Sequence, residues 1–415
     1  MTSRQFWARK QQELAFLGQW ADGAETPSLP DTTRDFNEAV ATLRERLFIS
    51  QAKKASTLWE TAPTGHSEVP GSLGTMSYTY QRYDLQSAST DWLRDLYACQ
   101  PDMADAEGLL FSCGMSAIGA TAAVLARREL STIAITPIAY FETHLLFRRF
   151  FSDVELTESN ADADVLWVDT SSTTWRVELQ EFSTSPKLLV IDTSCVDAVE
   201  DEVRTWLDRG RAWKCPVVLL RSHLKLDTFG LELGRLGSAL VICEHDQTAG
   251  EELSLELKQA RSGFGTNFST ACVYPWLGSS EFAALATQRG DGIRSSTTEI
   301  AEALSPIVDQ FDGCEIIETD HDLFFLIRTG LPLDNDSAEV RDSVISNTLG
   351  AACEAAALPA VSASSFGLDR VTVIDFVNMH DDAHYIRISG ADLPPGVSRD
   401  IGNAMGPALQ GLLAK

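Results

Sequence analysis

Short apolar runs alternate with segments of helical periodicity between residues 108 and 244, and this alternation limits the folds open to the chain. The runs read as strands at 132–136, 165–170, 188–193, 217–220 and 239–244. Apolar strands separated by helices are typical of a mainly parallel sheet covered on both faces. We therefore predict an α/β fold, a three-layer sandwich whose chemistry lies at the carboxyl ends of the strands.

The flanking sequence predicts two further regions. Apolar residues at helical spacing, for example Phe36, Val40 and Leu43, indicate amphipathic helices in an N-terminal arm, and residues 63–75 read as a loop because they are rich in Pro, Gly and Ser. After residue 278 the pattern favours a smaller α+β domain. Its helices are expected at 280–310, at 338–357 and after Pro395, and its strands at 314–317, 323–328, 371–377 and 385–390. The predicted domains are 1–75, 76–278 and 279–415.

Composition narrows the function classes. The 415 residues carry a formal net charge of −26, with 59 acidic against 33 basic residues. Such a chain repels phosphate backbones and anionic lipid, which disfavours nucleic-acid and membrane roles. The N-terminus lacks the apolar core of a signal peptide, so we expect a soluble, cytoplasmic protein. The eight cysteines form no C-x-x-C pair, and the sequence supports neither a disulfide framework nor a metal site.

A polar turn after the apolar run 217–220 presents Ser222 and Lys225 in one short segment. Burial at the end of an interior strand would lower the pKa of this lysine and make its neutral amine a nucleophile for an aldehyde, as in a Schiff base to pyridoxal phosphate (PLP). An ordinary loop lysine is the more frequent alternative for so short a motif.

A second strand end carries small residues. Residues 108–121 read as an apolar strand, the turn Cys113-Gly114-Met115 and an Ala-rich helix. This arrangement aims backbone N–H groups and a helix dipole at one point, which suits a phosphate. Close helix packing through small residues explains the segment equally well.

The order of these strand ends resembles that of the fold-type I PLP enzymes, and more closely the cystathionine γ-synthase and γ-lyase branch, over roughly residues 77–390. The family's Tyr-x-Arg arm is similar to Tyr80-Gln81-Arg82, and its Ser-Gly-Met phosphate turn to Cys113-Gly114-Met115. Its Tyr-Gly-Gly-Thr segment matches Tyr140 to Thr143 at both ends, and its Ser-x-x-Lys corresponds to Ser222 to Lys225.

Two further motifs are approached, and each implies a role. Asp192-Thr193 is one residue short of the family's Asp-x-Thr, and Arg387 opens a segment like its Arg-x-Ser-x-Gly. The resemblance implies that Asp192 keeps the pyridine nitrogen protonated, that Lys225 anchors the cofactor and moves the Cα proton, and that Arg387 grips the substrate carboxylate. Tyr80 and Arg82 would reach the phosphate in the neighbouring subunit, which implies a homodimer or homotetramer.

The chain also departs from the family. Leu224 stands where Ser or Thr is usual, and His223 either replaces the lost phosphate contact or fills the turn. Ser171-Ser172 stands where Asn-Pro-Thr is expected, and residues 364–370 look more like those of aminotransferases.

The resemblance implies an external aldimine with an amino acid and, through a quinonoid, β- or γ-elimination or γ-replacement. An activated substrate such as S-adenosylmethionine or an O-acylhomoserine would fit a specialised biosynthetic member. An aminotransferase is the first alternative, and a PLP-binding protein without turnover is the second.

Overall fold

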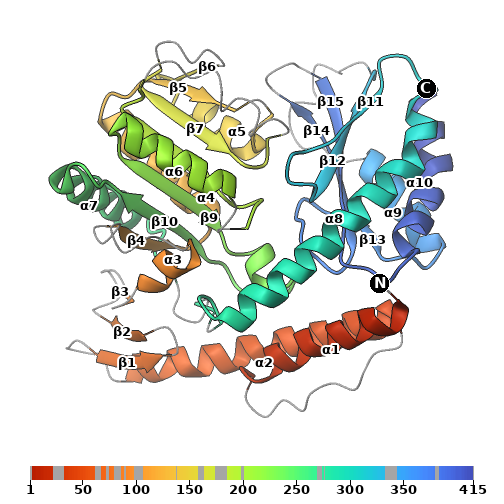
Figure 1. The fold of residues 1–415 in the computed structure, drawn as a ribbon, viewed down its shortest axis with the longest axis horizontal. Coiled ribbons are helices and arrows are strands. Elements are labelled where there is room, and N and C mark those ends of the chain that lie inside the picture. Colours follow the sequence, from red (N-terminus) through yellow and green to blue (C-terminus); the bar gives the residue numbers. More distant parts are fainter. Residues whose placement is uncertain are drawn as a thin grey trace. The chain divides into compact units, whose positions relative to one another are not determined.

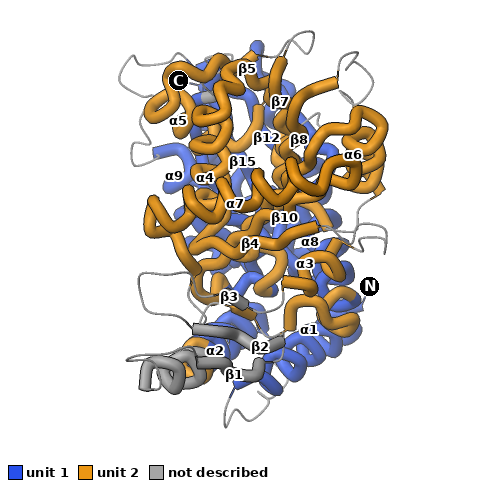
Figure 2. The backbone as a smooth tube through the Cα atoms, turned by 90° about the vertical axis from the view of Figure 1, so that its left-hand side faces the viewer, with its two compact units in different colours: residues 1–47, 229–231, 284–415 blue, residues 48–228, 232–283 orange. Residues whose placement is uncertain are grey.

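The computed structural model describes residues 2–21, 32–60, 67–71, 74–78, 86–87, 90–97, 106–136, 138–157, 163–172, 185–197, 201–268, 273–274, 276–331, 344–378 and 383–414, with only the backbone described at 34 and 51–87. The chain divides into two compact units (Figure 2). Unit 1 comprises Met1–Leu47, Phe229–Leu231 and Ala284–Lys415, and unit 2 comprises Phe48–Thr228 and Glu232–Ala283.

Unit 2 contains the predicted sheet (Figure 1). Its strands lie in the order β4-β10-β9-β8-β7-β5-β6. All neighbours are parallel except β10, which runs antiparallel to both β4 and β9. The strand bounds are β4 Glu107–Phe111, β5 Thr132–Ile135, β6 Glu155–Thr157, β7 Val165–Asp169, β8 Leu188–Asp192, β9 Val217–Ser222 and β10 Gly237–Ile242. The mainly parallel α/β sheet is thus confirmed.

Helices cover both faces of this sheet because alternate strand residues point to opposite sides. Val165, Trp167 and Val190 belong to one core cluster with apolar residues of α4 (Gly114–Arg127), α5 (Phe141–Phe150) and α7 (Gln247–Gly263). The intervening strand residues are also buried, and α6 (Asp201–Trp213) brings Gly210 against Val217 and Leu189 of that other set. The result is the predicted three-layer sandwich.

Unit 1 contains a second sheet in the order β11-β12-β15-β14-β13, antiparallel except for β13 and β14. Its apolar side chains form a core with those of three helices. The bounds are β11 Glu315–Ile317, β12 Phe324–Thr329, β13 Ala360–Ser362, β14 Val371–Asn378, β15 Ala383–Ser389, α8 Ser280–Val308, α9 Val344–Ala355 and α10 Val397–Leu413. The predicted strands and helices of the smaller domain are present, although residues 338–343 of one helix lie outside the described residues.

The N-terminal part holds α1 (Ser3–Gly18), α2 (Thr33–Glu60) and the short α3 (Asp91–Leu96). The prediction of a loop at 63–75 is wrong in part, because β1 (Ser67–Gly71) and the start of β2 (Gly74–Tyr78) lie within it and pair antiparallel with each other. β2 also pairs with β3 (Gln86–Ser87). Composition misled the prediction because β1 is an edge strand, and an edge tolerates Pro70. Among the described helices, none is both long enough and apolar enough to cross a membrane.

Gly237, the first residue of β10, allows the backbone of Cys113 and Gly114 to lie close to it, and a larger residue there should be destabilising. A Cβ on Gly237 would lie 2.3 Å from the carbonyl carbon of Cys113 and 2.6 Å from the Gly114 nitrogen. We expect Gly237→Ala to lower the free energy of unfolding by about 1–3 kcal/mol, because the turn before α4 must move. Gly119→Ala is the control, since a Cβ there meets no atom within 4 Å. Urea denaturation of both variants measures the effect, and equal stability would contradict it.

Candidate active site

The parallel strands of unit 2 bring most of the predicted site residues to one edge of the sheet. Asp192 is the last residue of β8, Ser222 is the last of β9, and Lys225 lies three residues beyond it. Tyr140 precedes α5 as its N-cap, and the Lys225 Nζ lies 5.2 Å from the centroid of the Tyr140 ring. The structure therefore gathers a lysine amine, an aromatic ring and a carboxyl group from separate parts of the sequence.

A second carboxyl group, Asp169, stands beside Asp192. The two residues are direct partners in the parallel register of β7 and β8. Asp169 accepts hydrogen bonds from the backbone N–H groups of Ser171 at 2.8 Å and Tyr140 at 2.9 Å, and so fixes the start of α5. Asp192 accepts one from the Ser194 N–H at 2.9 Å. Sequence reasoning missed Asp169, although its place at the end of a predicted strand was a usable signal.

Burial makes this carboxyl pair unusual. Desolvation, reinforced by the negative charge of Asp169, raises the pKa of Asp192 to about 7. Desolvation also raises the pKa of Asp169, against the hydrogen bonds of Ser171 and Tyr140. Because two neighbouring buried carboxylates resist ionising together, the pair retains a proton near neutral pH.

A buried ion pair clamps the turn that carries Lys225. Arg221 Nε and Nη2 donate to the two carboxylate oxygens of Asp227 at 2.8 and 2.7 Å, and Nη1 donates to the carbonyl of Thr193 at 2.6 Å. Although burial opposes its charge, Asp227 has a pKa held well below its usual range by Arg221 and His223. The pair closes the turn from Ser222 to Leu226 at its base, and the sequence analysis did not identify it.

His223 takes part in this clamp rather than in an open loop. Its Nδ1 lies 2.6 Å from Asp227 Oδ2 and its Nε2 lies 2.8 Å from the Ser238 hydroxyl. The ring packs edge-on against Trp92, with centroids 5.5 Å apart. Burial lowers the pKa of His223. Of its two roles left open by the sequence, these contacts favour filling the turn.

The turn before α4 presents backbone donors near Ser222. The N–H groups of Ser116 and Ala117 return to the Cys113 carbonyl, whereas those of Gly114 and Met115 begin the first helical turn, where N–H groups have no intrahelical acceptor. A Cβ on Gly114 would lie 2.7 Å from the Ser222 Cβ, so only glycine fits here. These donors can bind an anion.

Thr193, Arg387, Tyr80 and Arg82 complete the set of predicted residues. The Thr193 hydroxyl donates to the Leu220 carbonyl at 3.0 Å and meets the Tyr97 hydroxyl at 2.8 Å, which ties β8 to β9. Arg387 belongs to β15 of unit 1. Its guanidinium carbon lies 5.2 Å from the Phe324 ring centroid and 5.9 Å from that of Phe366. Tyr80 and Arg82 lie outside the described residues.

Comparisons with known proteins identify the fold. No family model and no curated protein matches the chain. The kynurenine aminotransferase of Pyrococcus horikoshii matches at 9% identity and a TM-score of 0.50, over 89% of this chain and 88% of that one. An α-aminoadipate aminotransferase of Thermus thermophilus matches at 15% identity and a TM-score of 0.49, over 88% of each chain. The metB product of Corynebacterium glutamicum matches at 17% identity and a TM-score of 0.48, over 81% of this chain and 88% of that one. The chain shares the fold of the Pyrococcus aminotransferase, and at this identity the likeness extends to the fold alone.

The clamp of Arg221 and Asp227 generates a prediction on stability. Asp227→Asn leaves the guanidinium of Arg221 buried without its counter-charge, which should cost about 3–5 kcal/mol in the free energy of unfolding. The double variant Arg221→Met with Asp227→Leu removes both charges and should recover much of that loss. Chemical denaturation of the single and double variants gives the comparison, and an Asp227→Asn protein as stable as the wild type would contradict the clamp.

The raised pKa of Asp192 predicts how stability depends on pH in the cofactor-free protein. Between its ordinary value of 3.8 and about 7, the folded state keeps a proton that the unfolded state has lost. Folding is therefore favoured by Asp192 at low pH, and this contribution disappears as the pH rises from about 4 to 7. Relative to Asp192→Asn, the wild type should lose at most about 4 kcal/mol over that window. A difference between the two proteins that stays constant from pH 4 to 8 would show that Asp192 titrates normally.

Proposed function

We propose that this chain is a PLP-dependent enzyme that acts on an amino acid. One observation carries the proposal: Lys225, the pair Asp169 and Asp192, and the first turn of α4 gather at the same edge of a mainly parallel sheet. Ligands of such sheets bind at the carboxyl ends of their strands. The shared fold with an aminotransferase is consistent with it.

The residues at this edge fit the functional groups of PLP. Lys225 offers an amine to the aldehyde, and Asp192 offers a buried acid to the pyridine nitrogen. The backbone N–H groups of Gly114 and Met115, with the hydroxyl of Ser222, would receive the phosphate. Tyr140 would stack on the ring. Thr193, which follows Asp192 in the sequence, is proposed to bind the cofactor as well.

Each of these residues has a defined task. When bound, PLP withdraws electrons from the Cα of an attached amino acid. Asp192 would hold a proton at the ring nitrogen, and the negative charge of Asp169 beside it would favour that proton. Lys225 would act as the general base that takes the Cα proton at its Nζ. The clamp of Arg221 and Asp227 orients that lysine by fixing both ends of its turn.

Substrate recognition is assigned to Arg387. A planar, permanently charged guanidinium suits a bidentate hydrogen-bonded pair with the α-carboxylate. The rings of Phe324 and Phe366 restrict its orientation before substrate arrives. Tyr80 and Arg82 are proposed to bind the phosphate of the neighbouring subunit, so that the active form is a homodimer or a homotetramer.

The reaction we propose is β- or γ-elimination or γ-replacement, with C–S or C–C bond formation on an activated substrate such as S-adenosylmethionine or an O-acylhomoserine. Support comes from the order of motifs from Tyr80 to Arg387. Transamination is the competing reaction, favoured by the aminotransferase-like residues 364–370. Single-turnover assays separate them, since transamination releases a keto acid and leaves stoichiometric pyridoxamine phosphate, whereas elimination releases a keto acid and ammonia and regenerates PLP. A PLP-binding protein without turnover would not exchange the substrate Cα hydrogen with solvent.

The anchor predicted at Lys225 can be tested by absorbance. Purified wild type supplied with PLP should show a band that borohydride removes, with the cofactor then attached to the Lys225 peptide on mass spectrometry. Lys225→Ala should show no such adduct. Lys187→Ala is the matched control, because Lys187 is exposed and pairs with Asp164 at the surface. A wild type that remains colourless after PLP is added would overturn the proposed function.

A further inference from the structure

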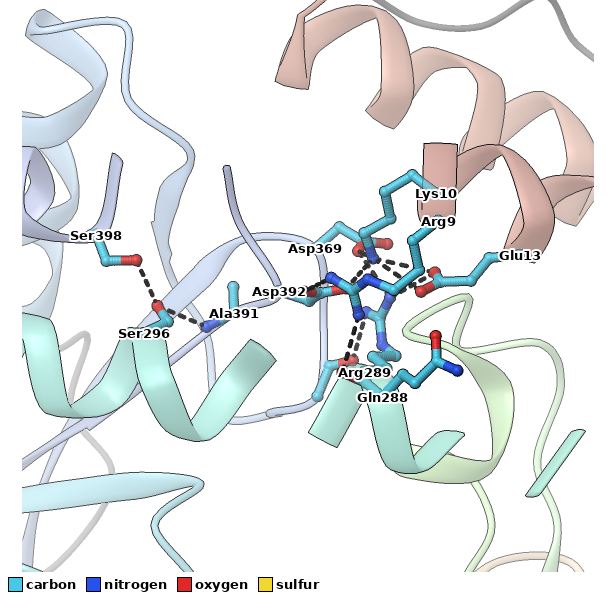
Figure 3. A network of polar contacts seen from close by, with 11 residues as sticks. Arg9, Lys10, Glu13, Gln288, Arg289, Ser296, Asp369, Ala391, Asp392 and Ser398 are labelled. Carbon is cyan, nitrogen blue, oxygen red and sulfur yellow. Dashed lines mark hydrogen bonds and ion pairs between the residues drawn. The ribbon is translucent and has the colours of Figure 1, made fainter. Parts of the chain in front are cut away.

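A cluster of six charged side chains lies in unit 1, five of them buried and Arg9 partly exposed (Figure 3). Three come from α1, one from α8, and two from the loops that follow β13 and β15. The members are Arg9, Lys10, Glu13, Arg289, Asp369 and Asp392. Lys10 is fully buried and Arg289 is 1% exposed. Three positive and three negative groups balance one another, which is the condition under which buried charges persist.

Lys10 and Arg289 converge on Asp369. Lys10 Nζ lies 3.0 Å from Asp369 Oδ1 and 2.5 Å from Asp392 Oδ2. Arg289 Nη1 lies 2.8 Å from the same Asp369 oxygen and 3.2 Å from Glu13 Oε2. Although burial opposes ionisation, Arg289 and Lys10 lower the pKa of Asp369, so its carboxylate remains charged. The loop at Asp369 is thus tied to both α1 and α8.

The same loop forms the surroundings of Arg387. Arg289 Nη2 donates to the Gly367 carbonyl at 2.9 Å. The next residue towards the N-terminus is Phe366, whose ring packs against Arg387 and against Phe324. Arg387 Nη2 also donates to the Ser364 carbonyl. Residues 364–369 are therefore fixed by the cluster at one end and contact Arg387 at the other.

Gly230 shows how closely the chain packs around Arg289. It adopts a φ of +72°, and a Cβ there would lie 2.6 Å from Arg289 Nη2 and 2.8 Å from the Gly367 carbonyl oxygen. Its neighbour Phe229 packs edge-on against Phe16 of α1, with centroids 5.9 Å apart. The side chain of Arg289 is consequently held on more than one side.

We infer that Lys10 and Arg289 are positioning residues for Arg387, because they hold residues 364–369 in the conformation that directs its guanidinium towards a substrate carboxylate. The inference rests on the proposed function of Arg387. It makes α1, at the opposite end of the sequence from β15, a requirement for carboxylate recognition. A cluster that served stability alone would not alter the choice between ligands.

Two oxyamine probes separate carboxylate recognition from the rest of the site. Aminooxyacetate and O-methylhydroxylamine would each displace the Lys225 amine from bound PLP, so that the C=N bond of an oxime replaces the C=N bond to the lysine, but only the first carries a carboxylate. The ratio of their rate constants, followed by loss of the cofactor absorbance in the PLP-loaded protein, reports recognition of the carboxylate. This readout requires neither the natural substrate nor turnover.

Arg289→Lys is the decisive variant, since it keeps the positive charge and gives up the hydrogen bond from Nη2 to the Gly367 carbonyl. We expect the ratio to fall by about tenfold or more, with the rate for O-methylhydroxylamine nearly unchanged. Arg294→Lys, on the same helix, is the control, because Arg294 pairs with Asp291 at the surface and should leave the ratio intact. Lys10→Met should act in the same direction as Arg289→Lys.

Arg387→Leu separates two claims: that Arg387 binds the substrate carboxylate, and that the charged cluster positions Arg387. If Arg387→Leu retains the wild-type ratio, Arg387 does not bind the carboxylate and its proposed role fails. If the rate ratio falls in Arg387→Leu but stays at the wild-type value in Arg289→Lys, the cluster only stabilises unit 1 and the inference is overturned. Should the cluster variants fail to fold by near-UV circular dichroism, Phe366→Leu tests the same path outside the cluster. An unchanged ratio in Phe366→Leu would equally overturn it.

Discussion

The ion pair between Arg221 and Asp227 is the interaction on which the candidate site depends. It spans the base of the turn that carries Lys225, and both partners are almost fully buried. A flexible lysine on an open loop would sample many orientations, whereas a closed turn limits where its amine can lie. The additional bonds of Arg221 to the carbonyls of Thr193 and Val196 tie this turn to the end of β8, where Asp192 stands. The guanidinium of Arg221 thus fixes the turn that carries Lys225 relative to the strand end that carries Asp192.

Parallel strands provide the second constraint, because their carboxyl ends meet at one edge whatever their distance in the sequence. Asp169 and Asp192 become neighbours through the register of β7 and β8 alone. Each accepts hydrogen bonds from backbone N–H groups, and the charge of Lys225 only partly offsets the effects of burial and of the neighbouring carboxyl group. That environment explains why their proton affinity is high.

The sequence predicted elements well where periodicity was strong and predicted interactions poorly where they depended on burial. The strands β5, β7, β8 and β9 lie within a residue or two of their expected bounds. The direction of β10 was not predictable, because an apolar run looks the same in either orientation. Arg221 was missed because the apolar run seemed to end at Leu220. The strand in fact continues to Ser222, and the arginine is buried within it.

The charged cluster around Asp369 and the carboxyl pair of Asp169 and Asp192 differ in their ability to exchange a proton. In the cluster around Asp369 each carboxylate faces a lysine or an arginine, so the charges neutralise one another and the pKa of Asp369 is lowered. In the pair at the sheet edge two carboxyl groups face each other, and the pKa of Asp192 is raised to about 7. The first arrangement holds structure in place, since its ion pairs tie the loop at Asp369 to α1 and α8. The second can take up or release a proton near neutral pH, which is the property that acid–base chemistry needs. A raised carboxyl pKa at a sheet edge where a second carboxyl group and a lysine amine gather is therefore a stronger sign of acid–base chemistry than a buried carboxylate tied into ion pairs.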